Sequence, residues 1–403
     1  MYKQIIKNSD IAIQIDSKII NIAECLNNSQ QSAIDIMGGK AGEILFWAHY
    51  SLYKKDEVIL NKVTAILSEV FEEIEKGFNY PTFAGGVAGI GWIVEYLVEN
   101  DFINADTNEI IGSLDDFLYP LMLNFIREGN YDYLHGALGI GLYFLKRQTN
   151  KSSLKYLLDL VNELDKIAIK DDSGVRWLSE LDRNKNTKGF NLSLSHGMSS
   201  IIAFLSKLYS AGIAEEKVIK LLNGAVKYLL SQQLNILKHK SNFPNWVCSE
   251  EPATHSRLAW CYGDLGIGMA LWQAGNNTKN ELWKEKAIEI LLHSTKRRDL
   301  KENSVVDAGL CHGAAGIAHI YNRMYRLTKI NAFKESAEYW FNQTLEMAIH
   351  KDSISGFKAY RIEKHGGSYE DFGFLEGIAG IGLTLISAVS DIEPKWDECL
   401  LLS

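Results

Sequence analysis

The sequence is poor in cysteine, in clustered positive charge and in long apolar runs, and each shortage excludes a class of protein. Its five cysteines form an odd, scattered set that does not suit a disulfide scaffold. The net charge is −8 and the longest basic run is only 296–298, which excludes a nucleic-acid partner. No signal-peptide pattern opens the chain, and no apolar run reaches the roughly 18 residues of a transmembrane segment. We expect a cytoplasmic protein with reduced thiols.

The composition is that of a globular protein with a large core. Of the 403 residues, 46% are apolar and 23% are charged, which excludes disordered and fibrous classes. Length alone suggests two or three domains, although toroids and barrels of this size exist as single units. The internal repeats therefore decide the domain organisation.

A Gly-x-x-Gly motif followed by an apolar run occurs seven times, and only the fourth copy replaces its second glycine, with Ser200. By subtraction, the first glycines lie 47 to 66 residues apart, a period that fits a helical hairpin with its loops. The pattern predicts one domain over residues 1–403. The copies are Gly39–Gly42, Gly86–Gly89, Gly136–Gly139, Gly197–Ser200, Gly263–Gly266, Gly313–Gly316 and Gly377–Gly380.

The segments on either side of each motif have different apolar patterns. Residues 56–71, which precede a motif, are amphipathic with a period of 3.6, whereas residues 381–389, which follow one, are apolar nearly all round. Seven outer helices and seven buried inner helices can hide all their apolar surface by closing into a ring, whereas an open solenoid needs polar caps. We therefore predict an all-α fold, a single (α/α) toroid.

The motifs also predict where a site can form. If each motif opens an inner helix, all seven lie at one end of the toroid, and the residues beside them converge on its axis. Helix starts and close packing explain most of these glycines, because a lone Gly-x-x-Gly is too weak to indicate a phosphate loop. Long loops precede three motifs, at 171–195, 239–260 and 352–374, and such loops often carry binding function.

Three residues beside the motifs are candidate metal ligands. Cys261 lies in Trp-Cys-Tyr-Gly, and Cys311 and His312 lie in Cys-His-Gly of the following repeat. Thiolate and imidazole are ligands that zinc prefers, and three protein ligands leave a fourth position open, as in catalytic sites. Without a Cys-x-x-Cys spacing, the residues alone also allow buried structural cysteines, the more common case, or a cysteine nucleophile.

His196 and Tyr262 occupy the position directly before a motif glycine, as His312 does. An imidazole there can act as a general acid or base near neutral pH, or it can simply cap a helix end. His135 and Glu376 also occupy this position, so occupying it does not prove a role in catalysis.

Asp132 and Arg257 each lie four residues before a motif position, Gly136 and Cys261 respectively. Both are candidates for the same cavity. The alternative is an ion pair between them, or a charge at a helix end.

Taken in order, Ser-His-Gly, Trp-Cys-Tyr-Gly and Cys-His-Gly on seven Gly-motif hairpins resemble the LanC family of lanthionine cyclases over nearly the whole chain. Asp132 and Arg257 fall where that family has an aspartate and an arginine. The resemblance implies one Zn²⁺ per chain, bound by Cys261, Cys311 and His312.

The resemblance also implies the reaction. A cysteine thiolate of a dehydrated lantibiotic precursor, still carrying its leader, adds to dehydroalanine or dehydrobutyrine and closes a thioether ring. His196 would supply the proton, and Asp132 would deprotonate the thiol or orient His196. Arg257 with Tyr262 would stabilise the enolate. The chain has no dehydratase region, so a separate dehydratase and an exporter are expected, with the protein at the periphery of a membrane-associated complex.

Three alternatives remain open at this stage. The first is a LanC-like protein that binds glutathione or adds it to dehydrated residues. The second is an α/α-toroid glycosidase, for which Asp132, Asp264 and Glu376 are candidate carboxylates. The third is a non-catalytic scaffold that holds a peptide at the mouth of the toroid.

Overall fold

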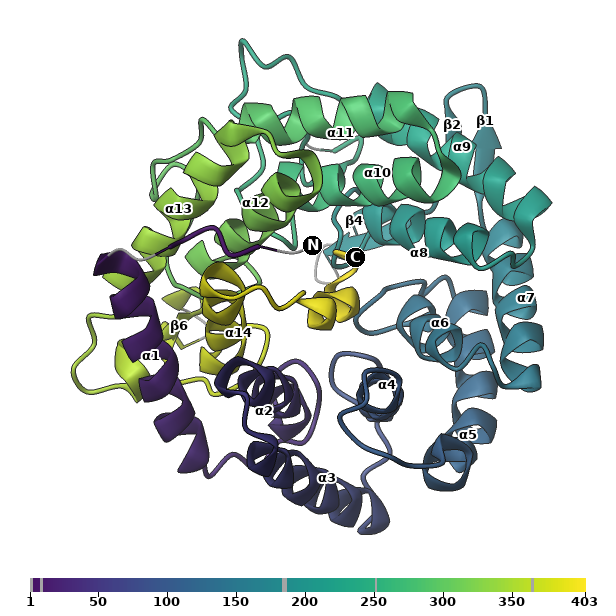
Figure 1. The fold of residues 1–403 in the computed structure, drawn as a ribbon. Coiled ribbons are helices and arrows are strands. Elements are labelled where there is room, and N and C mark those ends of the chain that lie inside the picture. Colours follow the sequence, from purple (N-terminus) through teal and green to yellow (C-terminus); the bar gives the residue numbers. More distant parts are fainter. Residues whose placement is uncertain (1–2, 8–9, 183–186, 251, 364–365) are drawn as a thin grey trace.

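The computed structural model describes residues 3–7, 10–182, 187–250, 252–363 and 366–403, and their α-helices alternate between an outer and an inner ring (Figure 1). The outer helices are α1 (Asp10–Asn27), α3 (Leu60–Glu75), α5 (Thr107–Arg127), α7 (Lys151–Lys166), α9 (Glu215–Ser231), α11 (Glu281–Ser294) and α13 (Asn331–Glu346). The inner helices are α2 (Lys40–Lys54), α4 (Val87–Glu99), α6 (Ala137–Lys146), α8 (Met198–Ser210), α10 (Asp264–Thr278), α12 (Ala314–Thr328) and α14 (Ile378–Val389). This confirms the predicted (α/α) toroid.

Burial distinguishes the two rings. Outer helix α3 buries Val63, Leu67 and Val70, spaced so that they form one stripe. Inner helix α4 buries almost every residue from Val87 to Leu97. Although the inner helices are apolar, no described helix is both long and apolar enough to cross a membrane.

The ring closes where its last helix meets its first ones. Helix α14 packs against α1, α2 and α12, so no inner helix is left with an exposed apolar face at an open end. The short helix η4 (Lys395–Leu400) occupies the centre of the ring (Figure 1). There Asp397 accepts hydrogen bonds from His319 Nε2 at 2.7 Å and from Arg323 Nε at 2.6 Å. The centre is therefore a packed plug.

The first glycine of every motif is the N-cap of an inner helix, as the sequence predicted. Gly263 needs to be glycine because its φ is +94°. The second glycine allows close approach instead: a Cβ on Gly316 would lie 1.9 Å from the carbonyl oxygen of Leu310. In the fourth repeat, the Ser200 hydroxyl donates to Gly197 O at 2.7 Å.

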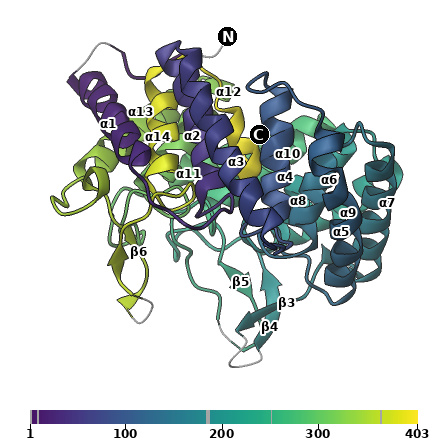
Figure 2. The same ribbon diagram turned by 90° about the horizontal axis from the view of Figure 1, so that it is seen from below.

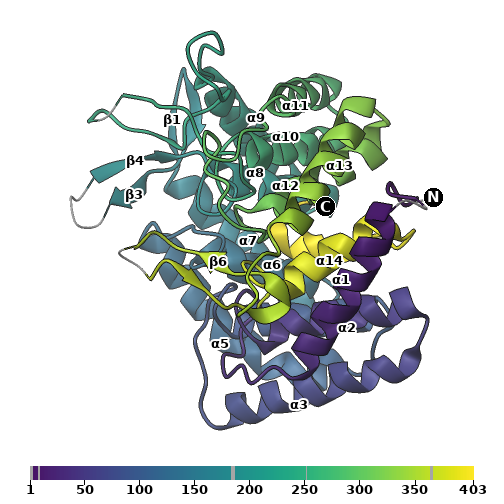
Figure 3. The same cartoon turned by 90° about the vertical axis from the view of Figure 1, so that its left-hand side faces the viewer.

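Short antiparallel strands occupy the three long loops, where the sequence predicted only loop. They project from one end of the toroid, opposite the N-terminus (Figures 2 and 3). Strand β1 pairs with β2, β4 lies between β3 and β5, and β6 pairs with β7. In register, Ile169 lies opposite Arg176, Phe190 opposite Val247 and Ala359 opposite Tyr369. The bounds are β1 (Ile169–Asp171), β2 (Gly174–Arg176), β3 (Ser179–Asp182), β4 (Thr187–Asn191), β5 (Trp246–Val247), β6 (Ala359–Tyr360) and β7 (Ser368–Tyr369). The short helix η2 (Ile354–Gly356) lies in the third of these loops, and η1 (Glu57–Ile59) directly precedes α3.

We expect Gly316→Ala to lower the free energy of unfolding by about 1–3 kcal/mol, because the new methyl group overlaps the Leu310 carbonyl. Urea denaturation measures the change. Gly112→Ala is the matched control, since a Cβ on this α5 glycine meets nothing within 4 Å. This substitution should raise the free energy of unfolding by about 0.5–1 kcal/mol, because alanine favours the helix more than glycine does. Equal stability of Gly316→Ala and the parent would contradict the assigned role of the motif.

Candidate metal centre

A ladder of main-chain hydrogen bonds links the loops that carry the motifs. The residue two positions before a motif glycine donates its amide to the carbonyl of the corresponding residue in the neighbouring repeat, at 2.8–3.4 Å. The seventh repeat bonds to the first in the same way, so the ladder passes through the ring closure. Both candidate cysteine ligands occupy this position and are adjacent in the ladder. In donor-to-acceptor order the members are Ser195, Cys261, Cys311, Leu375, Met37, Ala84 and Leu134.

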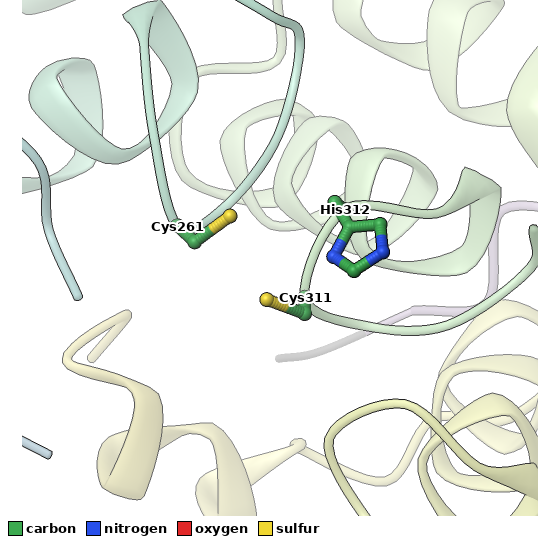
Figure 4. A group of neighbouring side chains, drawn as sticks. All are labelled: Cys261, Cys311 and His312. Atoms are coloured by element: carbon green, nitrogen blue, oxygen red, sulfur yellow. The ribbon is translucent and has the colours of Figure 1, made fainter. Parts of the chain in front are cut away.

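This ladder brings the three candidate ligands together (Figure 4). Cys261 lies on the loop before α10, Cys311 and His312 lie on the loop before α12, and their ligand atoms are all within 4.8 Å of one another. Two thiolates on one tetrahedral zinc, each about 2.3 Å from the metal, are about 3.8 Å apart. The donor set and its spacing therefore fit a single zinc ion with one position left for another ligand.

A buried carboxylate orients the imidazole of this group. His312 Nε2 lies 3.5 Å from Asp307 Oδ2, which leaves Nδ1 as the nitrogen for a metal. Burial lowers the pKa of His312, but the interactions of its imidazole with the Asp307 carboxylate and with Cys261 outweigh burial and raise this pKa to about 10. A carboxylate behind a ligating histidine fixes the ring and makes it a better donor.

The two thiols are hydrogen-bonded to each other. The bond from Cys311 lowers the pKa of Cys261 well below its ordinary value; burial opposes this effect, and His312 and Arg257 assist it. The same bond, together with burial, raises the pKa of Cys311. The pair therefore loses one proton readily, and thiolate is the form that binds metals.

Asp132 bonds to His196, which decides between the alternatives left open by the sequence. The His196 Nδ1–H donates to Asp132 Oδ2 at 2.7 Å, whereas Arg257 donates through Nη2 to Ser304 O at 2.8 Å. Burial alone would raise the pKa of Asp132 and lower that of His196, but the bond between them reverses both directions. His196 is therefore an imidazole that holds its proton more firmly than usual.

Tyr262 lies between the candidate metal ligands and the pair of Asp132 and His196. It directly follows Cys261, and its ring centre is 6.2 Å from that of His196. Its hydroxyl accepts a hydrogen bond from Asn191 Nδ2 at 3.3 Å. Burial raises the pKa of Tyr262, so the phenol remains a proton donor at neutral pH.

A cavity of about 820 Å³ opens beside His312, with His312 and Arg257 in its wall. Among the candidate site residues, Cys261, Cys311, His196, Asp132 and Tyr262 are not part of its described wall. The structure thus divides the sequence-predicted residues between the candidate metal ligands, of which His312 reaches the cavity, and the hydrogen-bonded pair of Asp132 and His196 from the loops before α6 and α8. Asp264 belongs to neither set of residues. It is fully buried and accepts hydrogen bonds from the backbone amides of residues 242 and 243.

Sequence reasoning missed Asp307, although a repeated signal marks it. Four repeats carry Asp or Asn six positions before the motif glycine, and each side chain accepts from the amide two residues later at 2.6–3.3 Å. Such Asx turns hold a loop without secondary structure. Arg257 takes the same place in the fifth repeat. The four residues are Asn130, Asn191, Asp307 and Asp371.

Comparisons with known proteins agree with this architecture. The family model described as "Lanthionine synthetase C-like protein" matches residues 30–401. "Nisin biosynthesis protein NisC" of Lactococcus lactis subsp. lactis is 24% identical over 395 residues, which covers 90% of this chain and 88% of that protein. "LanC-like protein GCL1" of Arabidopsis thaliana is 24% identical over 182 residues, 45% of this chain and 37% of its own. The solved structure "Nisin cyclase" has the same fold, with a TM-score of 0.74, 19% identity and 98% of each chain covered.

We expect Asp132→Asn to lower the pKa of His196, because the variant removes the charge that holds the imidazole proton. NMR titration of the imidazole measures this directly. Asp132→Glu keeps a carboxylate and should restore part of the shift. An unchanged His196 pKa in Asp132→Asn would show that the two side chains are not coupled.

Proposed function

The chain belongs to the lanthionine synthetase C-like family, and on that premise we propose that it is a zinc-dependent lanthionine cyclase. In this proposal, cysteine thiols of a dehydrated precursor peptide add to dehydroalanine or dehydrobutyrine and form thioether rings. The observation that carries it is the convergence of Cys261, Cys311 and His312 within 4.8 Å. These residues stand next to the Asp132–His196 pair at the same end of the toroid.

One zinc ion would be held by the two cysteine sulfurs and His312 Nδ1. When bound, zinc supplies a Lewis acid that lowers the pKa of a coordinated thiol, so that thiolate is available near neutral pH. The residues around the site contribute the rest of the chemistry. Asp307 fixes the ring of His312, and Arg257 places a positive charge beside the thiols.

The addition forms a bond from sulfur to the β-carbon, while the electron pair of the double bond moves toward the carbonyl as an enolate. Arg257 and Tyr262 can donate hydrogen bonds to that oxygen, which develops negative charge in the transition state. His196 then supplies a proton from Nε2 to the α-carbon, since its Nδ1 is bonded to Asp132. Asp132 orients this imidazole and stabilises its protonated form.

The proposal also fixes what must act before the protein. Dehydroalanine and dehydrobutyrine arise by loss of water from serine and threonine, so a dehydratase must act first on the leader-bearing precursor. We propose that this dehydratase and an exporter are separate partners. We also propose that the protein works in the cytoplasm, at the periphery of a membrane-associated complex.

We predict about one zinc ion per purified chain. We also predict that the zinc-loaded protein closes rings in a dehydrated cysteine peptide. The peptide then loses a thiol that can be alkylated, while its mass stays the same. Cys261→Ala and Cys311→Ala should empty the site and stop ring formation, because each removes a ligand. Metal analysis and mass spectrometry after alkylation give both readouts. Cys248→Ala, outside the ligand group, is the control. Ring closure by metal-free protein would overturn the proposed function.

We predict that His196→Ala keeps its zinc but closes rings about 10²–10⁴-fold more slowly, since it loses the proton donor. Single-turnover kinetics with metal analysis on the same sample separates the two effects. His135→Ala is the matched control, because this imidazole stacks on His196 at 5.9 Å but has no assigned role. A normal rate and normal product stereochemistry in His196→Ala would remove His196 from the mechanism.

A further inference from the structure

Two apolar side chains stand exposed in the wall of the 820 Å³ cavity. Val306 lies on the loop before α12, and Ile362 follows β6 in the β6–β7 hairpin. Each is 53% exposed, although both share the cavity with His312. Single exposed apolar residues are common on protein surfaces, but two in the wall of one cavity beside a candidate active site suit a binding function.

Asp307 links the two chain segments that carry Val306 and Ile362 to His312. Its Oδ2 accepts the amide of Tyr360 at 2.9 Å and lies 3.5 Å from His312 Nε2. Val306 directly precedes Asp307, and Ile362 comes two residues after Tyr360. Since consecutive Cα atoms are about 3.8 Å apart, both apolar residues lie within about two residues of this shared hydrogen-bonding carboxylate. The hairpin projects from the same end of the toroid as the other strands (Figure 3).

The carboxylates of the cavity wall already have cationic partners. Glu376 pairs with Arg361 at 3.4 Å, and Glu302 pairs with Lys240 at 2.8 Å. Arg361 also stacks over the ring of Tyr369 at 4.5 Å. These pairs neutralise the two carboxylates of the wall, which also contains Arg257. The two apolar side chains are surface that gains from being covered.

We propose that Val306 and Ile362 form an apolar clamp for the residue next to the reacting cysteine of the peptide substrate. This inference rests on the proposed function and adds a substrate class to it: cysteine peptides with an apolar flanking side chain. The cysteine itself would lie at the metal group. Its neighbour in the peptide is then one residue away and can reach the clamp.

The clamp distinguishes a peptide substrate from glutathione. Glutathione has a γ-glutamyl residue, a cysteine and a glycine, so it offers two carboxylates and an amino group but no apolar side chain. If the charged groups of glutathione covered Val306 and Ile362, they would lose hydration without gaining a polar partner from these two side chains. Although Arg257 in the same wall can attract a carboxylate, the two apolar side chains themselves favour a peptide with an apolar flanking residue over glutathione.

The test measures binding of three thiol probes to the zinc-loaded chain by calorimetry. The probes are acetyl-Leu-Cys-Leu-amide, acetyl-Ser-Cys-Ser-amide and glutathione, none of which can cyclise. We expect the leucine peptide to bind roughly tenfold more tightly than either of the others, the size of effect that small apolar contacts produce.

Variants locate the preference. Val306→Asp and Ile362→Asp, each at an exposed position that should not disturb folding, are expected to keep zinc and bind both peptides equally. Leu282→Asp is the matched control, because Leu282 on α11 is 74% exposed but lies outside the cavity wall. It should keep the preference for leucine.

Three results would overturn the clamp alone while zinc and thiol binding persist. They are equal binding of the two peptides by the parent chain, a leucine preference that survives both aspartate variants, or glutathione binding as tight as that of the leucine peptide. A parent chain that binds no zinc, or none of the three thiols, would instead overturn the proposed function, and the clamp with it.

Discussion

The main-chain hydrogen bonds between the motif loops are the constraint on which the site depends. Cys261 and Cys311 are separated by a complete helical hairpin, yet the amide of one bonds to the carbonyl of the other at 3.3 Å. The N-cap glycine fixes where each inner helix begins relative to its preceding loop. The main-chain hydrogen bonds then fix that loop relative to the loop of the neighbouring repeat. The candidate ligand atoms of Cys261, Cys311 and His312 therefore lie within 4.8 Å of one another.

Among the described residues, this ladder is interrupted between the third and fourth repeats. The amide of Leu134 bonds to Asp132 Oδ1 at 2.7 Å, and the other oxygen of Asp132 crosses to His196 in the fourth repeat. A side-chain bond between two ionisable groups thus takes the place of a main-chain bond. The carboxylate that joins the repeats is also the one that raises the pKa of the proposed proton donor, so the assembly of the ring and the proposed chemistry share one contact.

Much of this arrangement could be predicted from the sequence, because the first motif glycine and the same apolar patterns recur in every repeat. The motif glycines predicted every inner-helix start, and the shared motif register predicted that Cys261, Cys311 and His312 would converge. The partner of Asp132 could not be chosen, since Arg257 and His196 were both credible until the loops were placed. The strands escaped notice because β5, β6 and β7 have two residues each, too few for a period. Asp307 was missed because its Asx turn is visible only when the repeats are aligned on their glycines.

The central claim is that loops from two repeats hold one zinc ion through two sulfurs and one nitrogen. X-ray absorption at the zinc edge of the metal-loaded chain tests it most directly. The account predicts two sulfur neighbours at about 2.3 Å, with nitrogen or oxygen neighbours at about 2.0–2.1 Å. A zinc ion surrounded only by nitrogen and oxygen would contradict it.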